Sequence, residues 1–279
     1  MSALSGTDGQ NGNLQAAPLG LPPRAIGIRL AQIEPPKPQP QRRRGHALKE
    51  FLAKGRRQMR LFDTEGYELA VASFLQILDE APGYGPAHAG LAEAYSYWGF
   101  RREINGEESQ SYYALSLEHA EKAVDLAPDL GESHRALAVA LRRGEHANAE
   151  RRKEEVLIAL DLDPNSAENW YEYWRAFGYQ PHDTSIQRAL ELDPRLCAAE
   201  IDLGVVLCER DRLHEAARHL GKALEINPRN SLASYNLVMV LDRQGKGSAA
   251  REVLDRAREA HPNDPLITWA TENFGGYPA

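Results

Sequence analysis

Histidine and cysteine are the residues here with the most specific chemistry, because they bind metals and act as nucleophiles. The segment RLHEAARHL places His214 and His219 five residues apart. Two metal ligands on one face of a helix need a spacing of four, as in HExxH. The sequence also lacks GxSxG, a phosphate-binding glycine loop, HExxH and CxxC. These patterns predict no catalytic residue, no metal site and no cofactor, so we do not expect an enzyme.

The two cysteines, Cys197 and Cys208, are eleven residues apart on one predicted helix. That separation is too large for a disulfide between them, and we interpret them as buried thiols in a reducing compartment. The first thirty residues show no basic region followed by an apolar one, and no apolar run approaches the ~20 residues of a membrane span. We therefore expect a cytoplasmic protein.

The segment WYEYWRAFGY, residues 170–179, has six aromatic residues in a chain that is 8% aromatic. Trp170, Tyr173, Trp174 and Phe177 follow the spacing i, i+3, i+4, i+7, which puts them on one face of a helix. Such a face either fills the interior or binds a ligand. The elements around it decide between the two.

Charge and composition divide the chain into an arm and a body. Residues 1–60 hold eleven Lys and Arg against three Asp and Glu, a net charge of +8, so within the total of −7 residues 61–279 carry −15. Residues 1–45 are rich in Gly, Ser, Gln and Pro, and we expect them to be disordered when free. The arm contains an apolar island and a basic cluster that could bind the body or a partner: Ile26, Ile28, Leu30, Ile33, Arg42, Arg43 and Arg44.

From residue 46 onward, a proline recurs after each apolar helical stretch. The intervals between successive prolines are 46, 36, 30, 34 and 34 residues: Pro82, Pro128, Pro164, Pro194, Pro228 and Pro262. A period near 34 is typical of stacked helix–turn–helix repeats, in which proline ends the second helix of each repeat.

Small and large residues fall at the same places in successive repeats. Leu203, Gly204 and Leu207 precede Ala216, Leu220 and Ala223, and the same order returns 34 residues later. This pattern resembles the tetratricopeptide repeat (TPR) family over about residues 48–279. The resemblance implies an all-α, right-handed solenoid of six repeats with a C-terminal capping helix over residues 46–279. The second repeat carries about twelve extra residues, WGFRREINGEES, and the fourth is four residues short.

The TPR register also assigns the aromatic segment. It places Trp170, Tyr173, Trp174 and Phe177 at core positions, with Trp174 in the slot usually held by Gly or Ala. An indole there would fill the volume left by a short second helix. Tyr171 and Tyr179 fall at groove positions, where packing and binding stay equally open.

Binding in a TPR protein is expected on the concave groove that the first helices line. The family's groove positions correspond here to Arg135, Arg142, Arg143, Tyr171, Arg175, Tyr179, Tyr235, Asn236, Met239 and Arg243. We expect these side chains to be solvated and to anchor a partner protein or peptide, because Arg and Tyr are favoured at interfaces. Replacing Arg135, Arg142 and Arg175 by Glu is then expected to remove partner binding and leave stability near the wild type.

Two familiar TPR uses do not match. Ile201 and Val205 stand where a carboxylate clamp for chaperone tails needs Lys and Asn, and no base-reading pair recurs, so nucleic acid is not an expected partner. We expect an adaptor or scaffold. The alternative is a regulatory or sensory subunit of a separately encoded signalling enzyme, because the array looks like those attached to bacterial adenylate cyclases, kinases and transcriptional regulators. Partner identity and oligomeric state stay open.

Overall fold

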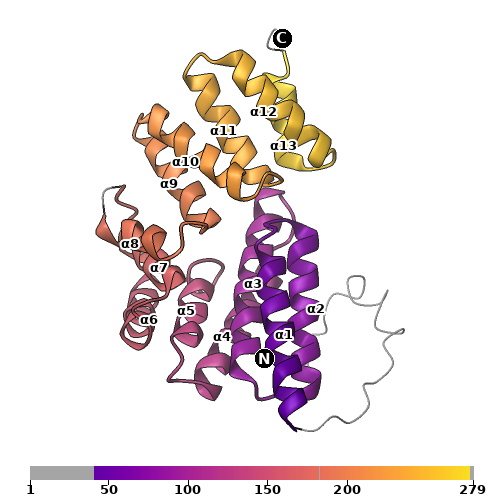
Figure 1. Cartoon of the computed structure of the whole chain (residues 1–279), viewed down its shortest axis with the longest axis vertical. Helices are drawn as coiled ribbons and strands as arrows, with labels where there is room; N and C mark the ends of the chain where they lie inside the picture. Colours follow the sequence, from indigo (N-terminus) through magenta and orange to yellow (C-terminus); the bar gives the residue numbers. More distant parts are fainter. Residues whose placement is uncertain (1–40, 182, 277–279) are drawn as a thin grey trace, which may run out of the picture. The chain divides into compact units, whose positions relative to one another are not determined.

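A computed structural model describes residues 41–181 and 183–276, and the apolar island Ile26, Ile28, Leu30 and Ile33 lies outside the described residues. In this part of the chain there are thirteen α-helices and no strand (Figure 1). The helices of the first three repeats are α1 (Gln41–Met59), α2 (Thr64–Glu80), α3 (Gly85–Ile104), α4 (Gln110–Leu126), α5 (Gly131–Ala140) and α6 (Ala149–Leu162). The others are α7 (Ala167–Phe177), α8 (Thr184–Leu192), α9 (Cys197–Glu209), α10 (Leu213–Ile226), α11 (Ser231–Arg243), α12 (Gly247–Ala260) and α13 (Pro265–Phe274).

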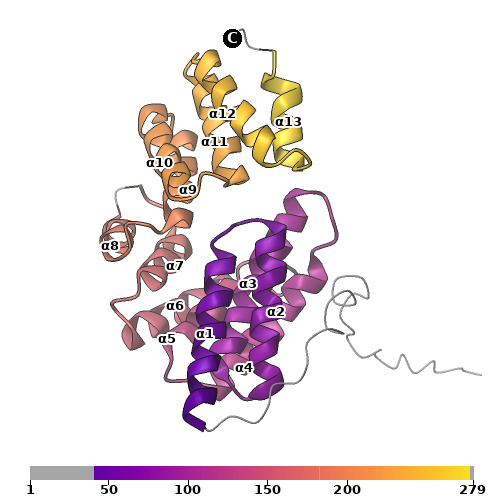
Figure 2. The same ribbon diagram turned by 45° about the vertical axis from the view of Figure 1, so that its right-hand side comes forward.

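The helices form six successive pairs, from α1 with α2 to α11 with α12, and α13 follows the last pair (Figures 1 and 2). Each odd-numbered helix packs against its even-numbered partner, and from α2 onward each even-numbered helix also packs against the next odd-numbered one. This arrangement confirms the expected all-α array of six repeats with a capping helix.

The sequence itself explains where the helices begin and end. Each proline of the 34-residue period lies two residues beyond an even-numbered helix, for example Pro82 after Glu80 and Pro228 after Ile226. Proline lacks the N–H that would continue the helix. Several helices start with a side-chain cap, such as the Asp63 carboxylate, which accepts a hydrogen bond of 2.7 Å from the Gly66 N–H.

Glycine appears where two helices approach most closely. A Cβ on Gly90 would lie 2.6 Å from the ring of the fully buried Phe74, and a Cβ on Gly204 would lie 2.6 Å from Leu220. Only glycine leaves room for these side chains, which fill the space within and between repeats.

Two repeats depart from the regular length, as the sequence predicts. The extra residues of the second repeat lengthen α3 to 20 residues, and a turn through Gly106 at φ 72° connects α3 to α4. In the fourth repeat α8 has only nine residues. The first helix also begins earlier than expected: Arg42, Arg43 and Arg44 lie within α1 and not in a disordered arm.

Contacts far apart in the sequence join the first repeats to the last. The Arg101 guanidinium, at the lengthened end of α3, donates 2.7 Å to the Ser231 hydroxyl and pairs with the Asp264 carboxylate at the start of α13. Arg101 and Asp264 are 8% and 7% exposed, so their pair is shielded from water. The Asn227 amide also donates to the Arg60 and Leu61 carbonyls. The array therefore closes on itself within the described residues.

Candidate partner-binding surface

One expected groove position can be compared in α7, α9, α11 and the capping helix α13. Tyr171, Ile201, Tyr235 and Trp269 are separated by 30, 34 and 34 residues and lie on α7, α9, α11 and α13. Tyr171 and Ile201 are 4% and 3% exposed, Tyr235 is partly exposed, and Trp269 is 43% exposed. At these expected groove positions the side chains are therefore buried on α7 and α9 and become accessible towards α13.

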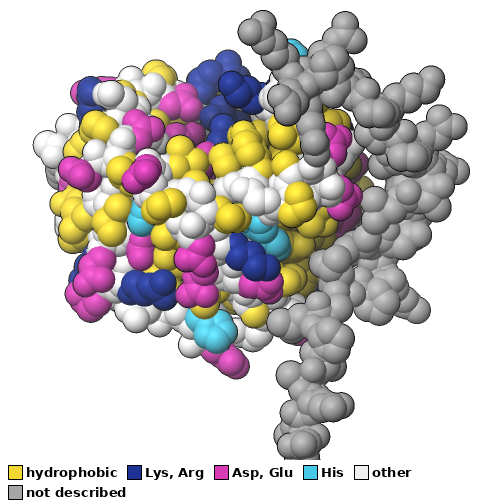
Figure 3. Space-filling model, turned by 90° about the horizontal axis from the view of Figure 1, so that it is seen from below, with side chains coloured by type: hydrophobic (Ala, Val, Ile, Leu, Met, Phe, Trp, Pro, Cys, Tyr) yellow, Lys and Arg dark blue, Asp and Glu magenta, His cyan; other side chains and the backbone are white. Residues whose placement is uncertain are grey.

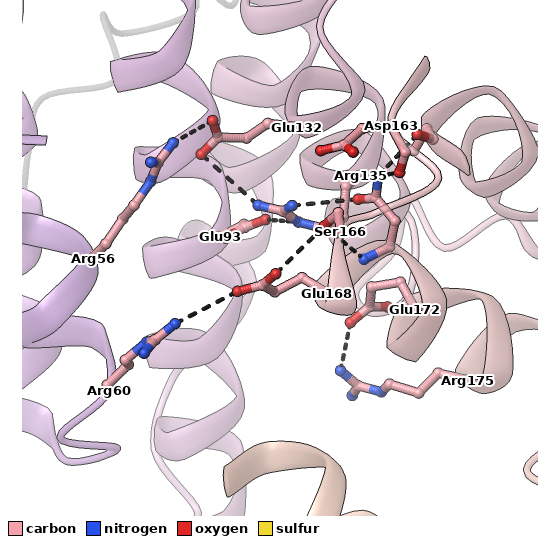
Figure 4. A network of polar contacts seen from close by, with 12 residues as sticks. Arg56, Arg60, Glu93, Glu132, Arg135, Asp163, Ser166, Glu168, Glu172 and Arg175 are labelled. Atoms are coloured by element: carbon pink, nitrogen blue, oxygen red, sulfur yellow. Dashed lines mark hydrogen bonds and ion pairs between the residues drawn. The ribbon is translucent and has the colours of Figure 1, made fainter. Parts of the chain in front are cut away.

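Charged side chains surround Arg135 of α5 (Figure 4). The Arg135 Nε donates 2.8 Å to Glu93 of α3, and its other nitrogens lie near Glu132 and the Asn169 side-chain oxygen. Burial raises the pKa of Glu93, and Arg135 opposes that rise. Burial also works against the charge of Arg135, but Glu93, Glu132 and Glu168 outweigh it and raise the Arg135 pKa above its ordinary value. The Arg135 guanidinium is thus held charged in the interior by the carboxylates around it.

A second buried group surrounds Arg175 of α7. Its Nη1 donates 2.7 Å to Glu172, and its Nε lies 3.3 Å from Asp202 of α9. The Tyr171 hydroxyl donates 2.8 Å to the same Asp202 carboxylate. Burial and the charge of Asp202 raise the Tyr171 pKa well above its ordinary value, so its hydroxyl remains a hydrogen-bond donor.

The last turn of α1 and the turn that follows it join this network from the start of the described chain. Arg56 pairs with Glu132, and Arg60 lies 3.6 Å from Glu168 and 3.7 Å from Asp193 (Figure 4). The first repeat therefore contacts the third and fourth repeats. The Arg135 and Arg175 side chains are 12% and 7% exposed, so the expectation that they are solvated is wrong. Their role in partner binding remains a prediction.

Helix α7 is buried both at Trp174 and on the side that carries Tyr171 and Arg175. Trp174 is 1% exposed and its indole N–H donates 2.7 Å to the Gln180 carbonyl, which confirms it as a core residue. Trp170 and Tyr173 are partly buried, but Phe177 is 41% exposed, so its expected place in the core is wrong. Phe177 is the last residue of α7, whereas Tyr171 and Arg175 on another side of α7 are buried.

The open end of the groove is aromatic. Tyr235 and Phe274 both contact Trp269 edge to face, with ring centroids 5.8 and 5.9 Å away. Asn236 and Met239 are partly exposed on the same helix as Tyr235, and Arg243 is exposed at its end. Sequence reasoning missed Trp269, although the 34-residue period from Tyr235 leads directly to it.

The remaining predicted groove residues lie elsewhere. The Tyr179 ring packs edge to face on Trp174 at 4.9 Å, in a left-handed conformation with φ 53°. Arg142 and Arg143 are partly exposed in the segment after α5. The structure therefore does not bring the ten predicted residues into one surface.

Other kinds of site are not found in the residues that the structure describes. Among them there is no group of three or more His, Cys, Asp or Glu placed to hold a metal ion. None of the described helices has the length and hydropathy of a bilayer span. Cys197 and Cys208 are both free, and Cys208, expected to be buried, is partly exposed. On the face drawn in Figure 3, acidic, basic and hydrophobic side chains are interspersed, apart from one group of Lys and Arg near an edge.

Comparison with solved structures gives the fold independently. The chain is similar to human IFIT1 in a dimer with m7Gppp-AAAA, at 17% identity and a TM-score of 0.61, covering 83% of this chain and 53% of that one. It is also similar to the APC/C hetero-tetramer Cut9-Hcn1, at 16% identity and a TM-score of 0.57, covering 81% and 42%. The chain thus spans about half the length of these two structures, and at such identities they support the fold alone. The search of curated proteins found no significant match.

The sequence also matches a family model directly. Residues 207–268, which run from the end of α9 into α13, match the model described as tetratricopeptide repeat. This region holds α10, α11 and α12 of the two repeats of unaltered length, and the four repeats before these two have the same helical pairing and proline positions. Residues 207–268 therefore match the tetratricopeptide repeat family, and the solved structures support the same fold for the array as a whole.

Proposed function

We propose that this protein is a protein-interaction scaffold, not an enzyme, and that a partner segment binds at the open end of its groove. The observation that carries the proposal is the rise in exposure along equivalent positions, from buried Tyr171 and Ile201 to Trp269 at 43%. An exposed Trp beside a partly exposed Tyr provides rigid apolar area with polar tips, which is typical of the residues that dominate binding energy.

The chemistry of this surface suits an extended or helical peptide with apolar anchors. Tyr235, Met239 and Trp269 offer apolar area, and the guanidinium of Arg243 lies at the end of the same helix. Arg243 already donates to the Cys208 carbonyl and pairs with Asp211, so it is held in place. We place this binding in the cytoplasm, where free cysteines such as Cys197 and Cys208 stay reduced.

The experiment selects peptides from a displayed library on the full chain and measures their dissociation constants. Trp269→Ala and Tyr235→Ala should each raise the dissociation constant about 30-fold, as for an interface residue that contributes ~2 kcal/mol. Leu157→Ala is the matched control, because Leu157 is 50% exposed on a second helix. Selected peptides that bind all three variants with unchanged affinity would show that the partner surface lies elsewhere.

A capped single-stranded RNA oligonucleotide belongs in the same assay, because the IFIT1 structure contains one. The proposal expects no competition between this RNA and the selected peptides. Residues 61–279 carry a net charge of −15, which disfavours a polyanion. If the RNA displaces the peptides and its binding depends on Trp269, the ligand of this surface is a nucleic acid and not a peptide.

A regulatory subunit of a separately encoded signalling enzyme remains the second candidate. The observation that favours it is the resemblance of the sequence to TPR arrays attached to cyclases, kinases and transcriptional regulators. The selected peptides distinguish the two, since a regulatory subunit should prefer segments of one enzyme over unrelated sequences.

A further inference from the structure

A cavity of about 480 Å³ opens beside the loop that joins α5 to α6, away from the groove positions of α11 and α13. The end of α3, the start of α4 and the loop itself form its walls. It is lined by Glu103, Gln110, Tyr113, Arg142, Arg143, Gly144, Glu145 and Ala147. Two arginines in one small cavity suggest a site for a negatively charged group.

Arg142 has donors that no other described residue satisfies. Its Nε and Nη1 are shielded from solvent and have no hydrogen-bond partner, and no ion pair to its guanidinium is present among the described residues. Leaving buried donors of a charged group without an acceptor costs free energy. Most of the other buried arginines, such as Arg101, Arg135 and Arg175, have carboxylate partners, so Arg142 is an exception that needs an explanation.

Its neighbour Arg143 has a carboxylate partner, although the Arg143 Nε also lacks a hydrogen-bond partner. The Arg143 Nη1 lies 3.7 Å from Glu103, and the Tyr113 hydroxyl donates to the same carboxylate. Burial and this carboxylate raise the Tyr113 pKa, so the hydroxyl keeps its proton. With Arg143 and Glu103 paired, Arg142 is the arginine of the cavity wall that has no ion pair among the described residues, and Glu145 lies in the same lining.

The walls around the two arginines are well packed. The Arg143 guanidinium lies 4.0 Å above the Phe100 ring, and that of Arg142 lies 5.8 Å from the Tyr97 ring. Gly144 has φ 80°, and a Cβ there would meet Tyr113 at 2.8 Å, so the loop is pressed against α4. The Glu145 N–H donates 3.2 Å to the Gln110 side chain, which fixes the loop further. A site held in this way loses little conformational entropy when a ligand binds.

We propose that this cavity binds the carboxylate of an acidic peptide through Arg142. A rotation of the Arg142 side chain turns its unsatisfied donors into the cavity, where a carboxylate oxygen accepts from them. The aromatic rings behind the guanidinium favour this contact. A buried charge without a partner costs free energy, and a bound carboxylate reduces that cost. The site is separate from the aromatic end of the groove and does not depend on it.

Charge decides for a carboxylate over a phosphate. The lining holds two arginines and two glutamates, and Arg142 is the arginine without an ion pair among the described residues, so a carboxylate adds one negative charge there. A phosphate dianion would add an unbalanced negative charge next to Glu103 and to a body that already carries −15 over residues 61–279.

The test uses NMR of the arginine Nε–Hε signals in the full chain during titration with three probes. Acetyl-Gly-Glu-Gly-amide carries only a side-chain carboxylate, acetyl-Gly-Gly-Gly carries only a C-terminal carboxylate, and inorganic phosphate carries neither. A saturable shift of the Arg142 signal with either peptide supports the proposal, and the stronger of the two identifies the source of the carboxylate. Phosphate should shift it less.

Arg142→Gln should weaken peptide binding tenfold or more, about the loss expected for one charge-assisted hydrogen bond. Arg256→Gln is the control, because Arg256 is 68% exposed on α12. No saturable shift with either peptide, a stronger shift with phosphate, or equal peptide affinity of Arg142→Gln and wild type would each overturn the proposal. The signals of wild-type Arg142 carry the test even if Arg142→Gln does not fold.

Discussion

At the scale of single residues, Trp174 is the clearest case of a side chain that fills space left by a short helix. It occupies the slot that Gly204 holds in the next repeat, and it is 1% exposed. Trp174→Ala should lower the free energy of unfolding by ~3–5 kcal/mol, because it leaves a large cavity and frees the Gln180 carbonyl. Phe177→Ala on the same helix should cost less than ~1 kcal/mol, since Phe177 is 41% exposed.

Denaturant unfolding of both variants checks this difference. Equal losses of stability would show that burial on α7 has been assigned to the wrong residues.

A second residue-scale prediction concerns His88 and His119, whose Nδ1 atoms lie 2.9 Å apart. The His88 Nε2 donates to the Pro82 carbonyl at 3.0 Å, so its Nδ1 is left to accept from His119. Burial lowers the pKa of His88, and burial together with His88 lowers the pKa of His119 to about 4. Both rings are therefore neutral in the folded protein at pH 7, with Glu118 and Lys122 as the nearest charges.

The sign of the pH dependence follows from proton uptake. Between pH 6.5 and about 4 the unfolded His119 binds a proton that the folded one does not, so stability is fully present above pH 6.5 and falls as pH falls. For His119 the loss amounts to ~3 kcal/mol. His119→Gln should remove this part of the pH dependence. Unfolding curves of wild type and variant that stay parallel from pH 7 to 4 would contradict it.

At the scale of elements, the ion pairs between α3, α5 and α7 hold the middle of the groove. Arg135→Met leaves Glu93 buried without its cation and should cost ~3–5 kcal/mol. Arg188→Met removes an exposed pair with Glu191 and should cost less than ~1 kcal/mol. Thermal or denaturant unfolding compares the two. A small effect of Arg135→Met would restore the expectation of a solvated groove.

The sequence predicted the elements better than their contacts. The proline period and the small residues at Gly90 and Gly204 are local features, and they led to the right helices and the right core slot for Trp174. The burial of Arg135 depends on Glu93 of α3, and that of Arg175 on Asp202 of α9, both in other repeats, and no local pattern shows it. Trp269 could have been found from the period, whereas no local pattern shows the exposure of Phe177.

At the scale of the whole described array, the contact of Arg101 with Ser231 and Asp264 joins the second repeat to the last one and the cap. In an ordinary repeat array each repeat contacts only its neighbours, so its ends open independently. Arg101→Leu should therefore lower the hydrogen-exchange protection of α11 and α13 more than that of α5 and α6. Arg102→Leu is the matched control, because Arg102 contacts only its own repeat, at Glu107 and Glu108. Equal protection in both variants would show that the closure does not couple the ends.

In the proposed function the partner binds beside the exposed Trp269 and not beside the buried Tyr171 and Ile201. Hydrogen exchange of the full chain with and without a selected peptide tests this directly. The peptide should slow exchange in α11 and α13, around Tyr235 and Trp269, and leave α5 and α7 unchanged. Protection that appears instead around Arg135 and Arg175 would contradict this proposal, because the partner would then bind where the side chains are already buried by the chain itself.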